Sequence, residues 1–217
     1  MAIKIYIDQG HNPRDYNTGA EAGGVYEQDI TYRIGKLLDG YLSQNPAFET
    51  RLSRPTEDTM LGTSNSSSLT ARVNEATAFG ADLFLSLHVN SAENPRATGN
   101  EALVYGPRST VARGVGEDVL EALTLTTGLR NRGVVYRPGL YVLRKTPMPA
   151  VMIEMGFISN PDDRELLVND PRLFALGIYR GLLKYYNIEC RALVELYSVK
   201  REILLRHGLS HSAEEVF

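Results

Sequence analysis

The chain has 217 residues, of which 43% are hydrophobic, so it can bury one substantial core but is too short for two full-sized domains with a linker. Its 23 Lys and Arg residues against 26 Asp and Glu residues give a formal net charge of -3, and the basic residues are scattered along the sequence. This balance argues against nucleic acid as a partner.

The single cysteine, Cys190, restricts the kinds of site that the chain can build. No intrachain disulfide and no thiolate metal cluster can form, so any metal must be held by histidine and carboxylate side chains. No apolar run reaches the roughly 18 residues that a membrane-spanning helix needs. Apolar alternation begins at Ile3, which leaves no room for a secretory leader, so we expect either a trimmed form or a leaderless protein.

Apolar runs rich in β-branched residues alternate with longer segments of helical period, which predicts a single α/β domain. Its centre is expected to be a mostly parallel, twisted, six-stranded sheet flanked by helices. The predicted strands are 3–8, 48–53, 82–88, 101–105, 140–144 and 150–155. Helices are expected at 26–43, 69–79, 111–126 and 170–186, with polar loops at 9–24 and 59–68.

The C-terminal segment is predicted to be separate from this domain. Residues 191–206 have helical spacing of their own, and residues 207–217 are polar. We therefore divide the chain into a main domain, 1–190, and an appended helix with a frayed tail, 191–217. His207 and His211 are spaced as a metal pair on a helix would be, but Gly208 between them favours a solvated end.

Three of the apolar runs end at a titratable side chain. His11 follows IKIYIDQG, His88 closes DLFLSL and Glu154 closes AVMI. In an open parallel sheet, functional groups gather at the carboxyl ends of the strands, so these three side chains are expected to converge on one cleft. Taken singly, each histidine also fits a hydrogen-bonded structural role, and Glu154 also fits half of a buried ion pair.

A catalytic zinc site usually takes three protein ligands, so the two histidines would need a carboxylate beside them. The ordered segments IDQGHN, GGVYEQD, SLTARVNEA, DLFLSLHVN, GNEALVY and LYVLRKTPMPAVMIEMGFISNPDD supply the context for finding it. Together they resemble the zinc-dependent N-acetylmuramoyl-L-alanine amidase family of bacterial autolysins and phage endolysins, from about residue 3 to residue 187.

The resemblance implies one zinc ion bound by His11, Glu27 and His88, with Glu154 as the catalytic carboxylate. The implied reaction is the cleavage by zinc-activated water of the peptidoglycan amide between N-acetylmuramic acid and L-alanine. The main domain, 1–190, would then be the catalytic domain. Without the family, Glu27 would be interpreted as a solvated acid that the helix dipole favours.

Four further residues match segments of the family and are expected to support the site: Asn90, Glu101, Arg54 and Arg72. For the two arginines, an exposed position or a structural ion pair fits as well. The chain departs from the family beside the first ligand, with Gln9 before Gly10-His11 and Asn12-Pro13 after it. Since proline restricts itself and its predecessor, that loop must follow a different path, which affects substrate preference rather than the metal.

Some cell-division members of the family carry a long inserted helix that covers the zinc. Here residues 106–133 hold only one ordinary helix and a short turn, so we predict an open cleft and a monomer that needs no activator protein. Peptidoglycan is the expected partner. The expected place of action is the cell wall, the periplasm or the outside of the cell.

Two other functions are compatible with parts of this pattern. A zinc exopeptidase-like hydrolase could use the same ligands on ordinary peptides. A catalytically inactive wall-binding protein is disfavoured because His11, Glu27, His88 and Glu154 are all present.

Overall fold

The order of the strands determines which side chains meet. In the computed structural model, which describes residues 1–189, six strands form one sheet in the order β4-β1-β5-β8-β6-β7. β4, β1, β5 and β8 are parallel, whereas β6 pairs antiparallel with β8 and parallel with β7. This confirms the predicted α/β fold with a mostly parallel six-stranded sheet. The strands are β1 (Ile3–Gln9), β4 (Phe48–Leu52), β5 (Leu83–Asn90), β6 (Asn100–Val104), β7 (Asn131–Tyr136) and β8 (Ala150–Phe157).

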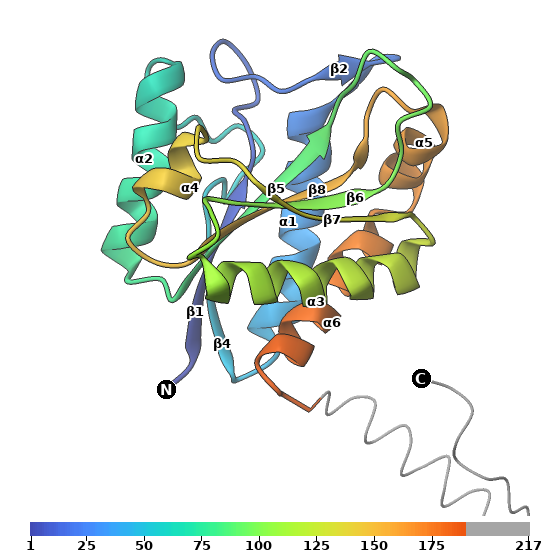
Figure 1. Cartoon of the computed structure of the whole chain (residues 1–217). Helices are drawn as coiled ribbons and strands as arrows, with labels where there is room; N and C mark the ends of the chain where they lie inside the picture. Colours follow the sequence, from blue (N-terminus) through green and yellow to red (C-terminus); the bar gives the residue numbers. More distant parts are fainter. Residues whose placement is uncertain (190–217) are drawn as a thin grey trace, which may run out of the picture.

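Helices cover both faces of the sheet, but unequally (Figure 1). On one face, α1, α3 and α6 pack over the larger apolar core. On the other, α2 and the short α4 cover a smaller core. The helices are α1 (Glu27–Ser43), α2 (Asn65–Phe79), α3 (Thr110–Thr127), α4 (Tyr141–Lys145), α5 (Pro161–Asn169) and α6 (Pro171–Tyr185).

The alternation of side chains along the strands places the polar groups on the less covered face. In β8, Val151 and Ile153 point into the larger core and Met152 into the smaller one, so Glu154 shares the face of Met152. The same alternation in β1, β5 and β6 puts further polar groups on this face. They are Asp8, Ser86, His88 and Glu101.

The predicted strand at 140–144 is wrong, because this segment forms the helix α4. Val142 and Leu143 are adjacent and both buried, so their side chains meet α2 and the smaller core from one short turn of helix. A five-residue apolar run carries too little periodicity to distinguish a strand from a helix.

Other boundaries also differ from the prediction. The sixth strand is β7, which begins at the end of the stretch 106–133, where only a helix and a short turn were expected, and α5 was not predicted. α2 begins at Asn65 rather than at residue 69, because Ser64 and Ser67 form a capping box. The expected loop 9–24 contains half of a small hairpin, β2 (Glu21–Ala22) with β3 (Val25–Tyr26).

The predicted helix at 191–206 and the tail with His207 and His211 lie outside the described residues. Within residues 1–189, none of the helices combines the length and the apolar character that crossing a bilayer requires.

Candidate active site

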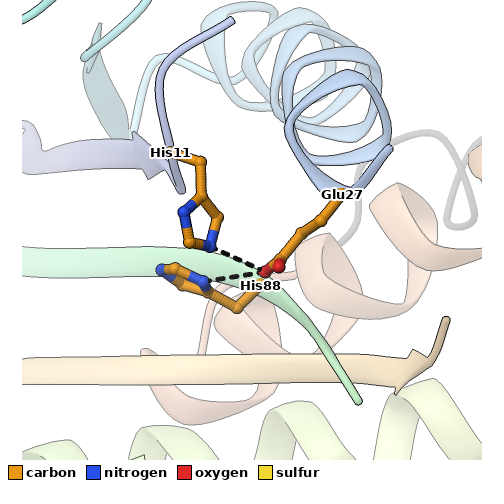
Figure 2. Close-up of side chains that lie close together, drawn as sticks. All are labelled: His11, Glu27 and His88. Atoms are coloured by element: carbon orange, nitrogen blue, oxygen red, sulfur yellow. Dashed lines mark hydrogen bonds and ion pairs between the residues drawn. The ribbon is translucent and has the colours of Figure 1, made fainter. Parts of the chain in front are cut away.

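Three side chains from three different elements converge at the carboxyl end of the sheet (Figure 2). His11 follows β1, Glu27 is the first residue of α1, and His88 lies near the end of β5. Glu27 Oε1 lies 3.1 Å from His11 Nε2 and 3.0 Å from His88 Nδ1. The ligand atoms that the three residues offer all lie within 4.8 Å of one another.

Backbone groups hold these side chains in place. The carbonyl oxygen of Asn17 lies 3.2 Å from His11 Nδ1, which fits a proton on that nitrogen and turns Nε2 toward Glu27 and His88. The two oxygens of Glu27 accept hydrogen bonds from the backbone N–H groups of Val89, at 3.0 Å, and Ala20, at 2.9 Å. The arrangement is therefore fixed before any ligand binds.

Glu27 is not the solvated acid that its position alone suggests, since its side chain is only 6% exposed. Burial by itself would raise the pKa of Glu27, but hydrogen bonds with His11 and His88 outweigh it and leave the pKa well below its ordinary value. Burial disfavours the charged form of His88, yet the hydrogen bond to Glu27 raises its pKa. Glu27 is thus an anion at neutral pH.

This donor set fits a zinc ion. Two imidazoles and one carboxylate are a ligand set that catalytic zinc sites use, and three protein ligands leave a position open for water or substrate. His11 and His88 also remain accessible, with side chains 19% and 16% exposed. The residues present are therefore suited in kind, spacing and access to hold the metal that the family resemblance implies.

The turn that carries His11 is held in an uncommon conformation. His11 has a φ of 71°, in the left-handed region that costs a residue with a side chain about 1–2 kcal/mol. Gly10 before it passes so close to His88 that an added Cβ would lie 2.5 Å from the ring carbon Cε1. The backbone thus turns sharply to bring both imidazoles together.

Arg72 on α2 donates hydrogen bonds that hold this turn. Its Nη2 donates to the carbonyl oxygen of His11 at 2.6 Å and its Nη1 to that of Gln9 at 2.8 Å. Nη1 also forms an ion pair with Asp8, whose other oxygen accepts from Ser86 at 2.7 Å. Burial would raise the pKa of Asp8, but the charge of Arg72 outweighs it and holds the pKa below its ordinary value.

The structure therefore places Arg72 against the turn that carries His11, together with Asp8 and Ser86, which the sequence analysis missed. A carboxylate inside the apolar run IKIYID needs a buried partner, and that requirement was the available signal.

The other expected supporting residues differ in what they touch. Arg54 is fully buried and donates to the carbonyl oxygen of Gln28 at 2.8 Å, so it contacts the first turn of α1 beside Glu27. Asn90 accepts a hydrogen bond from the backbone N–H of Ser91 at 2.9 Å, and within residues 1–189 its side chain makes no hydrogen bond to the three clustered side chains. Arg54 is thus bonded to the residue that follows Glu27, whereas Asn90 is bonded to the residue that follows itself.

Glu154 and Glu101 extend the site across the sheet. Glu154 is the register partner of His88 on one side and of Glu101 on the other. Its Oε2 is buried and has no hydrogen-bond partner among residues 1–189. Burial is the main cause that raises the pKa of Glu154 to about 7; the charge of His88 opposes this rise, and the carboxylates of Glu27 and Glu101 add to it. Such a group can both accept and donate a proton near neutral pH.

Comparison with known proteins is consistent with this geometry. Residues 5–184 match the family model described as N-acetylmuramoyl-L-alanine amidase. The chain is 33% identical to the N-acetylmuramoyl-L-alanine amidase CwlM of Bacillus licheniformis over 91% of its own length and 74% of that protein. It is 30% identical to the endolysin of Bacillus phage SPP1, over 87% of the chain and 68% of the endolysin.

A solved structure has the same fold. The crystal structure of an N-acetylmuramoyl-L-alanine amidase from Clostridium difficile 630 matches with a TM-score of 0.76 at 28% identity. The match covers 86% of this chain and 97% of that one. The similarity therefore extends over nearly all of the described fold.

Proposed function

The chain belongs to the N-acetylmuramoyl-L-alanine amidase family, and from that premise we propose that it works with a zinc ion held by His11, Glu27 and His88. It is a peptidoglycan hydrolase that cleaves the amide between N-acetylmuramic acid and the L-alanine of the stem peptide. The observation that carries the zinc proposal is the convergence of three ligand atoms within 4.8 Å of one another.

When bound, zinc supplies Lewis acidity, which polarises the scissile carbonyl and favours the loss of a proton from water near neutral pH. Glu154 accepts that proton as water attacks the carbonyl carbon. The unpartnered Oε2 is the atom available for it, because no protein donor occupies it within the described residues. As the C–N bond breaks, Glu154 passes the proton to the departing alanine nitrogen, and its pKa of about 7 suits both transfers.

Metal analysis combined with product analysis tests this proposal. We expect one zinc ion per chain, with release of muramyl saccharides and intact stem peptides from purified peptidoglycan. Chelation should stop the release and added zinc should restore it. Glu27→Gln keeps the shape of the side chain but removes the ligand charge, so it should lose both zinc and turnover.

Three results would contradict the proposal in different ways. Activity without bound metal would exclude the zinc site. Free amino acids as products would indicate an exopeptidase-like enzyme. Binding to the wall with neither zinc nor hydrolysis would indicate an inactive binding protein.

We propose further that the site is open and needs no activator. Within residues 106–133, α3 packs on the opposite face of the sheet, so it does not cover the imidazoles, which retain exposed surface. The purified chain should then run as a monomer of 24.1 kDa, with a specific activity that does not depend on its concentration. Negligible activity that rises steeply with a partner protein or with concentration would refute this.

The main domain, 1–190, is proposed to carry the activity, and the wall itself to be where it acts. Support comes from the core, which α6 completes by residue 185, and from the family match, which ends at residue 184. Truncation after residue 190 should leave kcat on soluble muropeptides unchanged. A large fall in kcat would assign residues 191–217 to the catalytic unit.

A further inference from the structure

One titratable or charged side chain stands on each successive strand along the carboxyl end of the central strands. The order across the sheet is His11 after β1, His88 on β5, Glu154 on β8, Glu101 on β6 and Arg132 on β7. Figure 1 shows β8, β6 and β7 side by side. The proposed reaction uses this row only as far as Glu154, so Glu101 and Arg132 have no role in it.

Irregular pairing at the edge strand aims Arg132 toward Glu101. The register between β6 and β7 shifts between Asn100 and Ala102, and Gly133 directly after Arg132 has a φ of 85°. Such a bulge re-aims a side chain at the edge of a sheet. As a result, Arg132 Nε lies 3.3 Å from Glu101 Oε1. Glu101 is on the strand next to that of Glu154.

The guanidinium of Arg132 is fixed by three contacts and still has donors to offer. Besides Glu101, its Nη1 donates to the carbonyl oxygen of Thr98 at 3.3 Å, and its Cζ lies 5.0 Å from the centre of the Phe157 ring. Its Nη2 makes no hydrogen bond to any of residues 1–189, and the side chain is 34% exposed. A guanidinium has five donors, so a second anion can be bound without breaking the ion pair.

One buried acid, Asp163, connects the groups that hold Arg132. Its two oxygens accept from the hydroxyl of Thr98 at 2.6 Å and from the backbone N–H of Phe157 at 2.9 Å. The carbonyl and the ring that hold the guanidinium are therefore anchored to the same residue. Such preorganisation is typical of a recognition site rather than of a loose surface arginine.

The chemistry of the proposed function sets the direction in which the substrate runs. The alanine nitrogen must leave beside Glu154, which gives it a proton, while the lactyl carbonyl lies at the three candidate ligands. The stem peptide is attached to that nitrogen, so it continues away from the ligands, over β6 toward β7. It therefore passes Glu101 and Arg132.

Distances along the stem peptide suit an encounter with Arg132. In peptidoglycan the second stem residue is D-glutamate linked through its side chain, so its α-carboxylate is free or amidated. That carboxyl group lies about 6 Å from the scissile nitrogen, since successive Cα atoms are about 3.8 Å apart. The guanidinium of Arg132 lies over β6, the strand next to that of Glu154, and neighbouring strands are about 4.8 Å apart.

Resting on the proposed function, we propose that Arg132, held by Glu101 and Phe157, is a specificity-determining residue that binds the free α-carboxylate of the second stem residue. Arginine pairs with carboxylates through two parallel N–H groups, and such charge-assisted hydrogen bonds are stronger than neutral ones. The enzyme should therefore prefer stems that carry D-glutamate over stems whose α-carboxyl is amidated.

The test compares two soluble muropeptides that differ only in this group, an α-carboxylate or an α-carboxamide on the second residue. The zinc-loaded full chain should favour the carboxylate in kcat/KM on the order of tenfold, as one charge-assisted pair predicts. Arg132→Gln should raise KM for the carboxylate substrate to that for the amide, with kcat little changed. Arg132→Lys should retain part of the preference, because it keeps the charge and loses the fork.

Two other arginines complete the design. Among the described residues, Arg113 on α3 pairs only with the exposed Glu117, so Arg113→Gln matches the charge change away from the site and should keep the preference. Arg137 is the other cation that could bind the carboxylate, because its charge lowers the pKa of Glu154. It makes no side-chain hydrogen bond or ion pair within residues 1–189. Arg137→Gln should also keep the preference.

Equal rates of the wild-type protein on both muropeptides would overturn the inference. So would a loss of preference in Arg137→Gln, or an equal fall in kcat on both substrates in Arg132→Gln, which a merely structural role would give. If the wild-type protein hydrolysed neither muropeptide nor whole peptidoglycan, the proposed function itself would fail, and the inference with it.

Discussion

The two halves of the site differ in how completely the protein satisfies its own polar groups. Both carboxylate oxygens of Glu27 accept hydrogen bonds from backbone N–H groups, and the buried Arg72 donates to the carbonyl oxygen of His11. Around Glu154, one carboxylate oxygen is buried without a partner within the described residues. We call these the ligand half and the carboxylate half.

The difference follows from what each half must do. A metal site needs side chains held within a fraction of an ångström, so its supporting bonds are made in advance. A group that transfers protons to and from substrate must keep an atom free, which costs folding free energy because a buried polar atom lacks its hydrogen bond. Substitutions should therefore disturb stability mainly in the ligand half and turnover mainly in the carboxylate half.

The largest effect is expected from Glu154→Gln in the carboxylate half. Glutamine fills the same space but cannot accept the proton from water, so kcat should fall by about 10²–10⁴-fold, the usual contribution of general acid–base catalysis. Zinc content should stay at one ion per chain, and thermal stability should not fall. Activity within tenfold of the wild type would remove Glu154 from the chemistry.

In the ligand half, Arg72→Met should give the largest loss of stability. It leaves Asp8 buried without its cation, and breaking a buried pair from one side typically costs about 3–5 kcal/mol. It also removes the donor that holds the carbonyl of His11, so zinc affinity should fall. Urea unfolding and zinc titration of the folded protein measure the two effects.

Arg54→Met is the matched control for this variant. Arg54 is equally buried, but its guanidinium donates to backbone carbonyls and forms no ion pair with a carboxylate within residues 1–189. The loss should therefore be smaller, about 1–2 kcal/mol for unpaired carbonyl groups. If both variants lost the same stability, the ion pair with Asp8 would not be what distinguishes the ligand half.

The elements that carry the site could largely be predicted from the sequence. β1, β5 and β8 are apolar runs with clear ends, and His11, His88 and Glu154 stand at those ends. Glu27 was reachable only through the family resemblance. It is the first residue of a long amphipathic helix, where an acid is ordinary, and only the tertiary fold places α1 against β5.

What the sequence did not predict lies mainly at the edge of the sheet. β7 contains Gly133 in a left-handed conformation and is partly exposed, so it lacks the alternation that marks a strand. The short α4 was taken for a strand because Tyr141 and Val142 favour strands when packing is not known. The buried partners of Asp8 are distant in sequence. The sequence therefore indicates that Asp8 needs a cation, but not which residue supplies it.

A fall in pH should also lower the free energy of unfolding through the ligand half, with a smaller effect than the substitutions above. The folded pKa of Asp8 lies below its unfolded value, so the pair with Arg72 contributes stability that is fully present above about pH 4 and is lost as the pH falls through the folded value. In metal-free protein, the free energy of unfolding should fall more steeply below about pH 4 in the wild type than in Asp8→Asn. Parallel pH profiles for the two proteins would show that Asp8 is not linked to folding in this way.

The smallest effect is expected at Asn90, although it was predicted to support the site. Within residues 1–189, its side chain accepts a hydrogen bond only from the backbone N–H of Ser91, directly after β5, and makes no hydrogen bond to either half of the site. Asn90→Ala should therefore cost less than about 1 kcal/mol of stability, leave zinc affinity unchanged and alter kcat/KM less than about twofold. These are measured by urea unfolding, zinc titration and muropeptide turnover. A tenfold loss of kcat/KM with normal stability would instead mean that Asn90 contacts the substrate, which would extend the carboxylate half along β5.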